Sequence, residues 1–138
     1  MYQTEFNYSI AELFVRCFLG ILFIFQGYDK LFVVKIKNVV NAFHNETDRK
    51  HIPQFLLVLT SYFTSISEFF GGILLLFGLF HQIVPVILAI NLLVVTFAFS
   101  FLRPMWDLQH MFPRVVLITL ILLLSNYFYF GLDTLIFK

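Results

Sequence analysis

The fold is decided by residues 10–32, IAELFVRCFLGILFIFQGYDKLF. This stretch is long and apolar enough to cross a bilayer, whose ~30 Å hydrocarbon core needs about 20 helical residues. One face of the predicted helix nevertheless carries two cations and two glycines at helical spacing: Arg16, Gly20, Phe23, Gly27 and Lys30. We expect this face to contact protein rather than lipid. For Arg16 two interpretations stay open: it faces the bundle interior, or it extends to the lipid headgroups as an anchor.

The composition is that of an integral membrane protein. The 138 residues are 60% hydrophobic and 12% charged, with a mean hydropathy of +0.90, whereas soluble domains have about 25% charged residues. The length predicts a single transmembrane domain over residues 1–138, without room for a soluble catalytic domain. The formal net charge of +1 argues against a nucleic-acid partner.

Cysteine and histidine do not predict a metal site. Cys17 is the only cysteine, which excludes an internal disulfide and a cysteine-bound zinc or iron–sulfur site. His44 and His51 are separated by polar residues, and no third ligand pattern accompanies them. We therefore expect no metal.

Hydropathy predicts an all-α membrane protein with four transmembrane helices in an up-and-down bundle. The expected helices cover about residues 10–32, 52–80, 83–102 and 112–130. Residues 1–9 are expected to form a short tail at the interface. Between the first two spans, apolar residues at helical spacing predict a short interfacial helix: Val33, Ile36, Val40 and Phe43.

Positive charges concentrate in the first and third connections. The Lys and Arg residues of these connections and their flanks are Lys30, Lys35, Lys37, Arg49, Lys50, Arg103 and Arg114. Arg16 and Lys138 lie toward the other side. The positive-inside rule then places both connections in the cytoplasm and both termini outside it.

Glu68 and Asn91 are polar residues inside predicted spans. An intramembrane carboxylate must pair with a cation, be protonated or face water, and all three stay open for Glu68. Asn91 lies on the same side of the membrane centre as Arg16 if the helices alternate in direction, and asparagine commonly bonds across helices. We expect Arg16, Glu68 and Asn91 to form one polar cluster, for which Arg16 must reach inward across several residues of depth.

Glycines on the first two spans predict close helix packing. Small residues let helix backbones approach each other inside a membrane. The positions expected to do so are Gly20, Gly27, Gly71, Gly72 and Gly78.

Two motifs carry a resemblance to a known family. In residues 15–32, VRCFLGILFIFQGYDKLF, an arginine-bearing helix runs into Gly-x-x-Lys-Leu with Arg16, Gly20, Gly27, Lys30 and Leu31. In residues 67–80, SEFFGGILLLFGLF, a glutamate precedes a glycine and a Leu-rich run to a further glycine, with Glu68, Gly72, Leu75 and Gly78. These features resemble the DoxX family of small four-helix membrane proteins.

The turn before the last helix extends this resemblance. Family members often have an aromatic and histidine cluster there, followed by Phe-x-Lys-Asn. Trp106, His110 and Phe112 stand at these places, with Arg114 where the family has Lys and Val115 where it has Asn. The candidate contacts to a ligand or partner are Lys30, Trp106, His110 and Arg114.

The resemblance implies an accessory subunit of a membrane redox assembly, next to quinone, in the bacterial cytoplasmic (inner) membrane. We expect no catalytic activity of its own. An arginine and a carboxylate in a low dielectric could orient a quinone head group or pass a proton to it. Two alternatives stay open. One is a proton- or cation-coupled carrier or channel module that works as a homo-oligomer around Glu68. The other is a purely structural scaffold.

Overall fold

The computed structural model describes residues 2–42, 53–102 and 108–136. Within these ranges the chain is helical and contains no strand, which confirms the predicted all-α fold. The elements are α1 (Tyr2–Tyr28), the π-helix η1 (Asp29–Val33), α2 (Ile36–Ala42), α4 (Gln54–Phe77), α5 (Ile83–Leu102), α6 (Leu108–Leu124), the 3-10 turn η2 (Ser125–Tyr127) and α7 (Leu132–Ile136).

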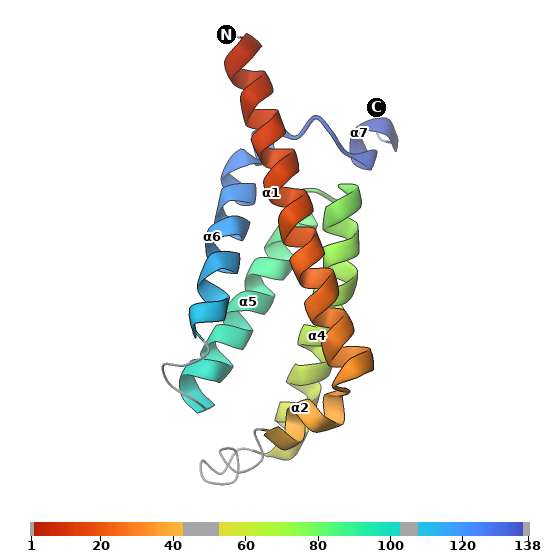
Figure 1. The fold of residues 1–138 in the computed structure, drawn as a ribbon, viewed down its shortest axis with the longest axis vertical. Coiled ribbons are helices and arrows are strands. Elements are labelled where there is room, and N and C mark those ends of the chain that lie inside the picture. The colour runs from red at the N-terminus through yellow and green to blue at the C-terminus, as the bar shows by residue number, and fades with distance from the viewer. Residues whose placement is uncertain (1, 43–52, 103–107, 137–138) are drawn as a thin grey trace.

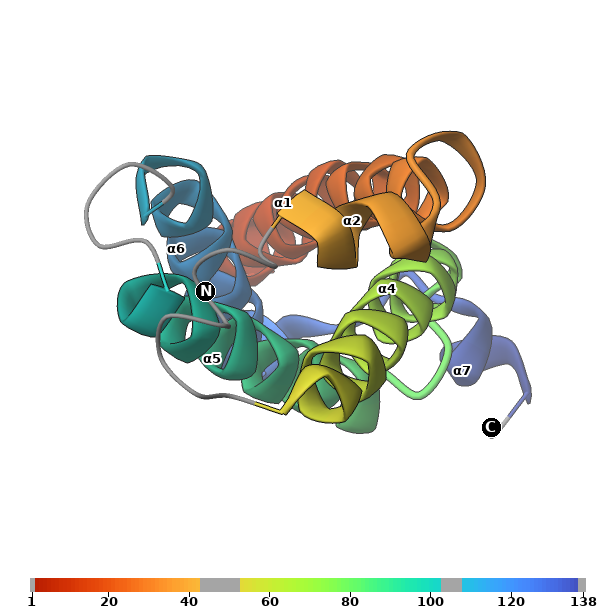
Figure 2. The same cartoon turned by 90° about the horizontal axis from the view of Figure 1, so that it is seen from below.

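Four long helices run alongside one another (Figure 1). α1 packs on α4, α4 on α5, α5 on α6, and α6 on α1, so each long helix has two neighbours. Seen along the bundle, α2 lies across the end at which α1 stops, and it packs on α4 (Figure 2). Both ends of the described chain lie at the opposite end of the bundle (Figure 1).

Three helical stretches are long and apolar enough to cross a membrane: Gln3–Val33, Gln54–Phe77 and Met111–Ile136. The stretch Ile83–Ala98 is also apolar but shorter. The chain is therefore an integral membrane protein, and the fourth crossing stays a prediction.

Two predicted boundaries differ from the structure. The expected N-terminal tail is wrong, because α1 begins at Tyr2. Neither Pro nor Gly interrupts residues 2–9, and Ser9 Oγ donates a hydrogen bond to the Glu5 carbonyl within the helix at 2.9 Å. The last long helix ends at Leu124, before the expected residue 130, because the chain turns through η2 and folds back toward α7.

The short helix between the first two spans is present as α2. Its apolar residues Ile36 and Val40 are buried, and α2 packs on α4. Val33 was expected on the same face but is exposed, because it belongs to the π turn that precedes α2. Phe43 lies outside the described residues.

The core is made of apolar side chains from all four long helices. Its buried residues include Leu19, Phe23, Leu75, Leu88, Leu92, Met111, Ile118 and Ile121. Many large apolar side chains instead face outward, as a lipid environment allows: Phe14, Phe55, Phe97 and Phe112 are among the most exposed.

Glycines set the distance between α1 and α4. A Cβ built on Gly27 would lie 2.5 Å from the backbone N of Phe69, and one on Gly72 would lie 2.8 Å from the backbone N of Ile24. A Cβ on Gly20 would lie 3.1 Å from the Gly72 carbonyl oxygen. The two backbones therefore meet at a spacing that a larger residue would prevent.

Gly27→Ala should destabilise the bundle, and Gly71→Ala should not. Both changes give the same gain in helix propensity, about 1 kcal/mol. The new methyl group at residue 27 meets the α4 backbone, whereas at residue 71 it meets the Leu88 Cδ2 methyl, which can move. We expect Gly27→Ala to lose about 1–3 kcal/mol to overpacking. Thermal unfolding in detergent, followed by circular dichroism, measures both, and equal midpoints would contradict this account of the helix contact.

Candidate functional site

A buried carboxylate joins three helical elements at one point of the bundle. Glu68 of α4 is 1% exposed. Its Oε2 accepts a hydrogen bond from Lys30 Nζ at 2.6 Å, and its Oε1 accepts one from Asn91 Nδ2 of α5 at 3.4 Å. We call Lys30, Glu68 and Asn91 the Glu68 centre. Of the three environments considered for Glu68, the structure shows pairing with a cation.

The π turn η1 positions Lys30. Its wider turn directly follows α1, and the backbone N of Val34 donates to the Asp29 carbonyl at 2.7 Å to close it. Single π turns inside helices are rare and occur often at functional sites. The Lys30 side chain is 22% exposed, in contrast to the buried carboxylate that it binds. The Glu68 centre thus has one member that reaches the surface.

Further polar groups surround this centre. Arg114 of α6 lies close enough to Glu68 for an electrostatic interaction. Ser65 shares the buried face of α4 one turn before Glu68. Ser65 Oγ and Asn91 Oδ1 are both buried, and neither has a hydrogen-bond partner in the described part of the chain. Buried polar atoms of this kind are uncommon in folded proteins.

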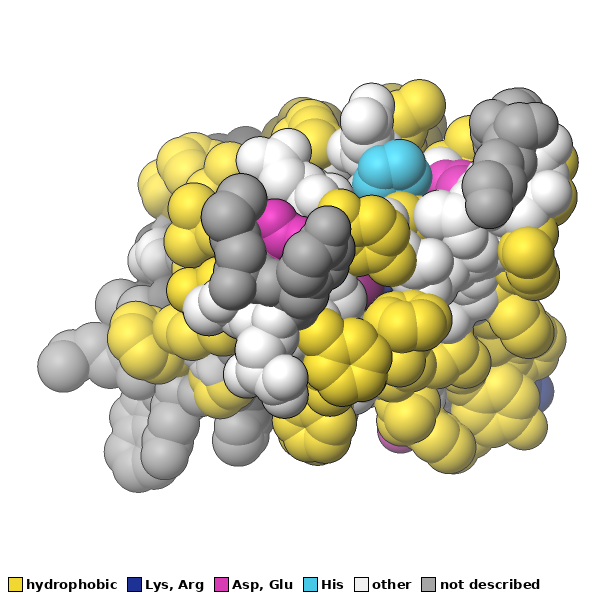
Figure 3. Space-filling view, turned by 90° about the horizontal axis from the view of Figure 1, so that it is seen from above, with side chains coloured by type: hydrophobic (Ala, Val, Ile, Leu, Met, Phe, Trp, Pro, Cys, Tyr) yellow, Lys and Arg dark blue, Asp and Glu magenta, His cyan; other side chains and the backbone are white. Residues whose placement is uncertain are grey.

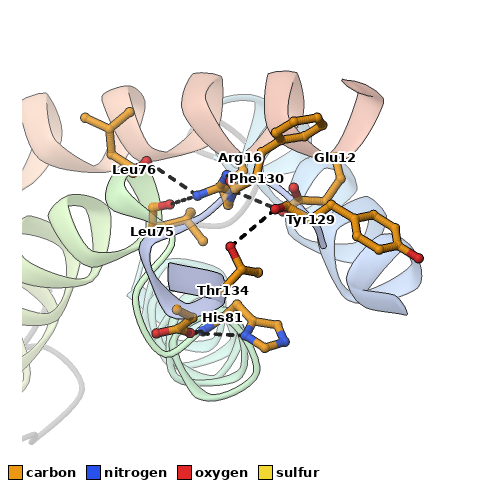
Figure 4. Close-up of polar contacts among 9 residues, drawn as sticks. Glu12, Arg16, Leu75, Leu76, His81, Tyr129, Phe130 and Thr134 are labelled. Atoms are coloured by element: carbon orange, nitrogen blue, oxygen red, sulfur yellow. Dashed lines mark hydrogen bonds and ion pairs between the residues drawn. The ribbon is translucent and has the colours of Figure 1, made fainter. Parts of the chain in front are cut away.

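Arg16 belongs to a second centre, at the far end of α4. It is fully buried with Glu12, and its Nε lies 3.0 Å from Glu12 Oε1 without hydrogen-bond alignment. Arg16 Nη1 donates to the carbonyl oxygens of Leu75 at 3.2 Å and Leu76 at 3.5 Å, and Nη2 donates to that of Phe130 (Figure 4). We call Glu12 and Arg16 the Arg16 centre. The arginine therefore faces the bundle interior and does not act as a headgroup anchor.

The C-terminal segment folds back onto this end of the bundle. Asp133 Oδ2 accepts hydrogen bonds from the backbone N of His81 at 2.8 Å, and it lies 3.1 Å from His81 Nδ1. The backbone N of Asp133 donates to the Gly78 carbonyl at 3.2 Å. The Phe128 ring stacks on His81 with a centroid distance of 4.2 Å, and the Arg16 guanidinium lies 5.0 Å from its centroid. Arg16 and His81 thus hold the segment from two sides.

A cavity of about 400 Å³ lies beside this contact, with His81, Phe128 and Asp133 in its wall. The His81 side chain is 28% exposed, and a histidine, coloured cyan, is visible at the end of the bundle that carries the termini (Figure 3). Among the described residues, no group of three or more His, Cys, Asp or Glu is arranged to hold a metal ion. His44 and His51 lie outside the described residues.

A family model described as DoxX matches residues 11–100, which is more than half of the chain. The chain belongs to the DoxX family. No curated protein and no solved structure matches it significantly. The matched residues include Arg16, Lys30, Glu68 and Asn91. Both buried ionic centres therefore have residues in the part of the chain that matches DoxX.

The expected cluster of Arg16, Glu68 and Asn91 is divided in this DoxX protein. Glu68 and Asn91 lie together, but Arg16 bonds to Leu75 and Leu76. Leu75 lies seven residues beyond Glu68, which is about 10 Å along a helix. This depth is too large for the arginine side chain to span, because helical side chains lean toward the N-terminus and Arg16 therefore leans away from Glu68.

The remaining predicted positions have varied surroundings. Gly71 contacts Leu88 of α5 rather than α1. Gly78 does not pack two long helices: it ends α4 with φ +66°, in the left-handed region that favours glycine, and lies near Gly131 and Phe128. His110 falls in α6, and its side chain lies outside what the structure describes, as does Trp106.

Sequence reasoning missed three residues that form polar contacts at the Arg16 end of the bundle: Glu12, His81 and Asp133. Glu12 could have been found, because it stands four residues before Arg16 on the same helix, at the spacing of an ion pair. His81 and Asp133 are 52 residues apart, and no local pattern connects them. Their contact depends on the C-terminal segment folding back, which the expected helix to residue 130 did not include.

Arg16→Met should loosen the C-terminal segment. It removes the guanidinium contacts to Phe130 and Phe128, and one hydrogen bond to a charged group contributes about 1.5–3 kcal/mol. We expect amide hydrogen exchange at Asp133 and Thr134 to become about tenfold faster or more. Lys30→Met serves as the control, since Lys30 bonds to Glu68 and not to the C-terminal segment. Unchanged exchange in Arg16→Met would show that the segment docks without the arginine.

Proposed function

We propose that this DoxX protein is an accessory subunit of a membrane redox assembly, with its Glu68 centre adjacent to a quinone site. It contributes a polar, partly exposed contact inside the membrane rather than a redox centre of its own. Membership of the DoxX family supports the membrane setting, and the geometry of Lys30 and Glu68 supports the quinone contact.

The Lys30 ammonium is the observation that carries this proposal. It has three N–H donors, of which one is directed to Glu68 Oε2. A quinone head group offers two carbonyl acceptors and no donor. A partly exposed ammonium at the edge of an apolar bundle is therefore a suitable hydrogen-bond donor, and the neighbouring carboxylate offers a place for a proton. Intramembrane ion pairs of this kind often mark functional sites.

The outer surface supports an assembly role. Among the large apolar side chains of the long helices, the most exposed are phenylalanines, including Phe97 of α5 and Phe55 of α4. In a bilayer such a surface is covered by lipid or by helices of a partner. A partner subunit that supplies the quinone and the electron donor would cover one side of this bundle.

The proposed topology has four crossings with both termini outside the cytoplasm. α5 has 20 residues, about 30 Å of helix, which matches the hydrocarbon core. Lys30, Lys35 and Lys37 lie at or beyond the end of α1, whereas Glu5 and Asp133 lie toward the ends of the chain. The positive-inside rule favours the cytoplasm for the lysine-rich end, with α2 in the interface.

Gentle detergent extraction of the tagged chain should recover stoichiometric partner subunits and bound quinone. Mass spectrometry identifies the chains, and organic extraction with liquid chromatography identifies the quinone. Lys30→Met should lower quinone recovery by about tenfold, the worth of one hydrogen bond to a charged group, while the partner subunits remain. Arg16→Met is the matched control at the other end. A lone, monodisperse protein without quinone would overturn the proposed function.

The orientation predicts opposite labelling at the two ends. In a Cys17→Ser background, a cysteine introduced in place of Lys37 should react with a membrane-impermeant maleimide only after the cells are permeabilised. Glu5→Cys, which is also at an exposed position, should react in intact cells. Labelling of Lys37→Cys in intact cells would reverse the proposed topology.

A further inference from the structure

The Asn91 amide uses only one of its two polar groups. Its Nδ2 donates to Glu68 Oε1 over a long 3.4 Å contact. Its Oδ1 is buried and has no hydrogen-bond partner among the described residues. Asn91 itself is completely buried. An unpaired buried acceptor is unfavourable, so the arrangement with an ionised Glu68 leaves part of this amide unsatisfied.

A protonated Glu68 would change this balance. An ionised carboxylate only accepts hydrogen bonds, whereas a carboxylic acid has one O–H to donate. Rotation of the Asn91 amide by half a turn exchanges its Nδ2 and Oδ1 at the Glu68 oxygen. The acid O–H then donates to Oδ1, which is the acceptor that the ionised state leaves unpaired, and Nδ2 moves to the place that Oδ1 leaves.

We propose that Glu68 is a proton-binding site inside the bundle and that Asn91 follows its protonation state by reversing its amide. The proton adds to Glu68 Oε1, so that carboxylate and hydronium ion become carboxylic acid and water. Lys30 stays an ammonium and releases its contact with Oε2. No electron transfer and no bond other than the O–H bond are involved.

The surroundings of Lys30 provide the route to solvent. Its side chain is 22% exposed, whereas Glu68 is 1% exposed. It lies on a π turn, and the backbone a few residues later has a positive φ of 64° at Lys35, a non-glycine residue. Unusual backbone of this kind clusters at sites where a change of state takes place. When the lysine side chain rotates outward, water reaches the carboxylate from this end.

Charged groups facing Glu68 come from several elements. Lys30, which follows α1, bonds to Glu68, and Arg114 of α6 interacts with Glu68 electrostatically. On α2, which packs on α4, the only charged residue is the exposed Lys37. α5 has no charged residue, and α4 has no other than Glu68. The charged groups nearest to Glu68 among the described residues are therefore cations.

Infrared difference spectroscopy on the purified full-length chain in lipid nanodiscs tests this proposal. A pH step from about 8 to about 5, chosen to span the usual range of perturbed carboxyl groups, should produce the C=O band of a buried carboxylic acid. Glu68→Gln should abolish the band. Asp29→Asn, which removes the exposed carboxylate of the π turn, should retain it. Asn91→Leu should move the band to higher frequency, because the acid loses its acceptor.

The outcomes separate the possibilities. A wild-type spectrum without a Glu68-dependent band overturns proton binding, even if the Asn91 variant does not fold. The same band frequency in wild type and in a folded Asn91→Leu protein overturns the role of the amide. Because the isolated chain is used, neither result depends on partner subunits or quinone, whose absence would overturn only the accessory function.

Discussion

The structure depends on how closely the backbones of α1 and α4 approach. Gly27 lies against Phe69, and Gly20 and Gly72 lie against each other. Because the two helices are antiparallel, this contact fixes which residues of α1 lie at each depth of α4. Lys30 arrives beside Glu68, and Arg16 arrives at the carbonyl end of α4. Both ionic centres therefore follow from one helix contact.

The two centres satisfy their charges in different ways. Arg16 is enclosed with Glu12 and donates hydrogen bonds to backbone carbonyls in the last turn of α4. It therefore fixes the C-terminal segment in place. Lys30 and Glu68 share one short contact, and one of them reaches the surface. A charge pair with an exposed member can separate at lower cost than one that is wholly buried, so the Glu68 centre is the better candidate for chemistry.

The sequence predicted the helices better than their contacts. Apolar runs and the lengths demanded by a bilayer located α4 and α5 within a few residues, since hydropathy reports burial in lipid directly. Charged residues inside apolar spans were also readable, because such charges are costly. Their partners were not, because pairing depends on the depth offset between helices. Arg16 and Lys30 were expected on one face of the first span, yet Lys30 reaches the interior of α4 at Glu68 and Arg16 reaches its last turn.

Local backbone irregularities account for the remaining differences between the predicted and the observed structure. The π turn at Asp29–Val33 has no distinctive sequence signal, although it determines where Lys30 points. The bend after Leu124 likewise depends on contacts of Asp133 and Phe128 with residues near His81, more than 40 residues away. Contacts between distant segments cannot be inferred from helical periodicity, which describes only one helix at a time.

The extent of the DoxX match separates the two centres further. Residues 11–100 contain every member of the Glu68 centre, whereas the carbonyl of Phe130 and the Asp133 contact lie beyond that range. All three residues of the Glu68 centre therefore lie within the DoxX match. Glu12 and Arg16 also lie in the match, but the Phe130 carbonyl to which Arg16 donates belongs to the returning segment beyond it. Arg114, which lies on the last long helix and outside the match, also interacts electrostatically with Glu68.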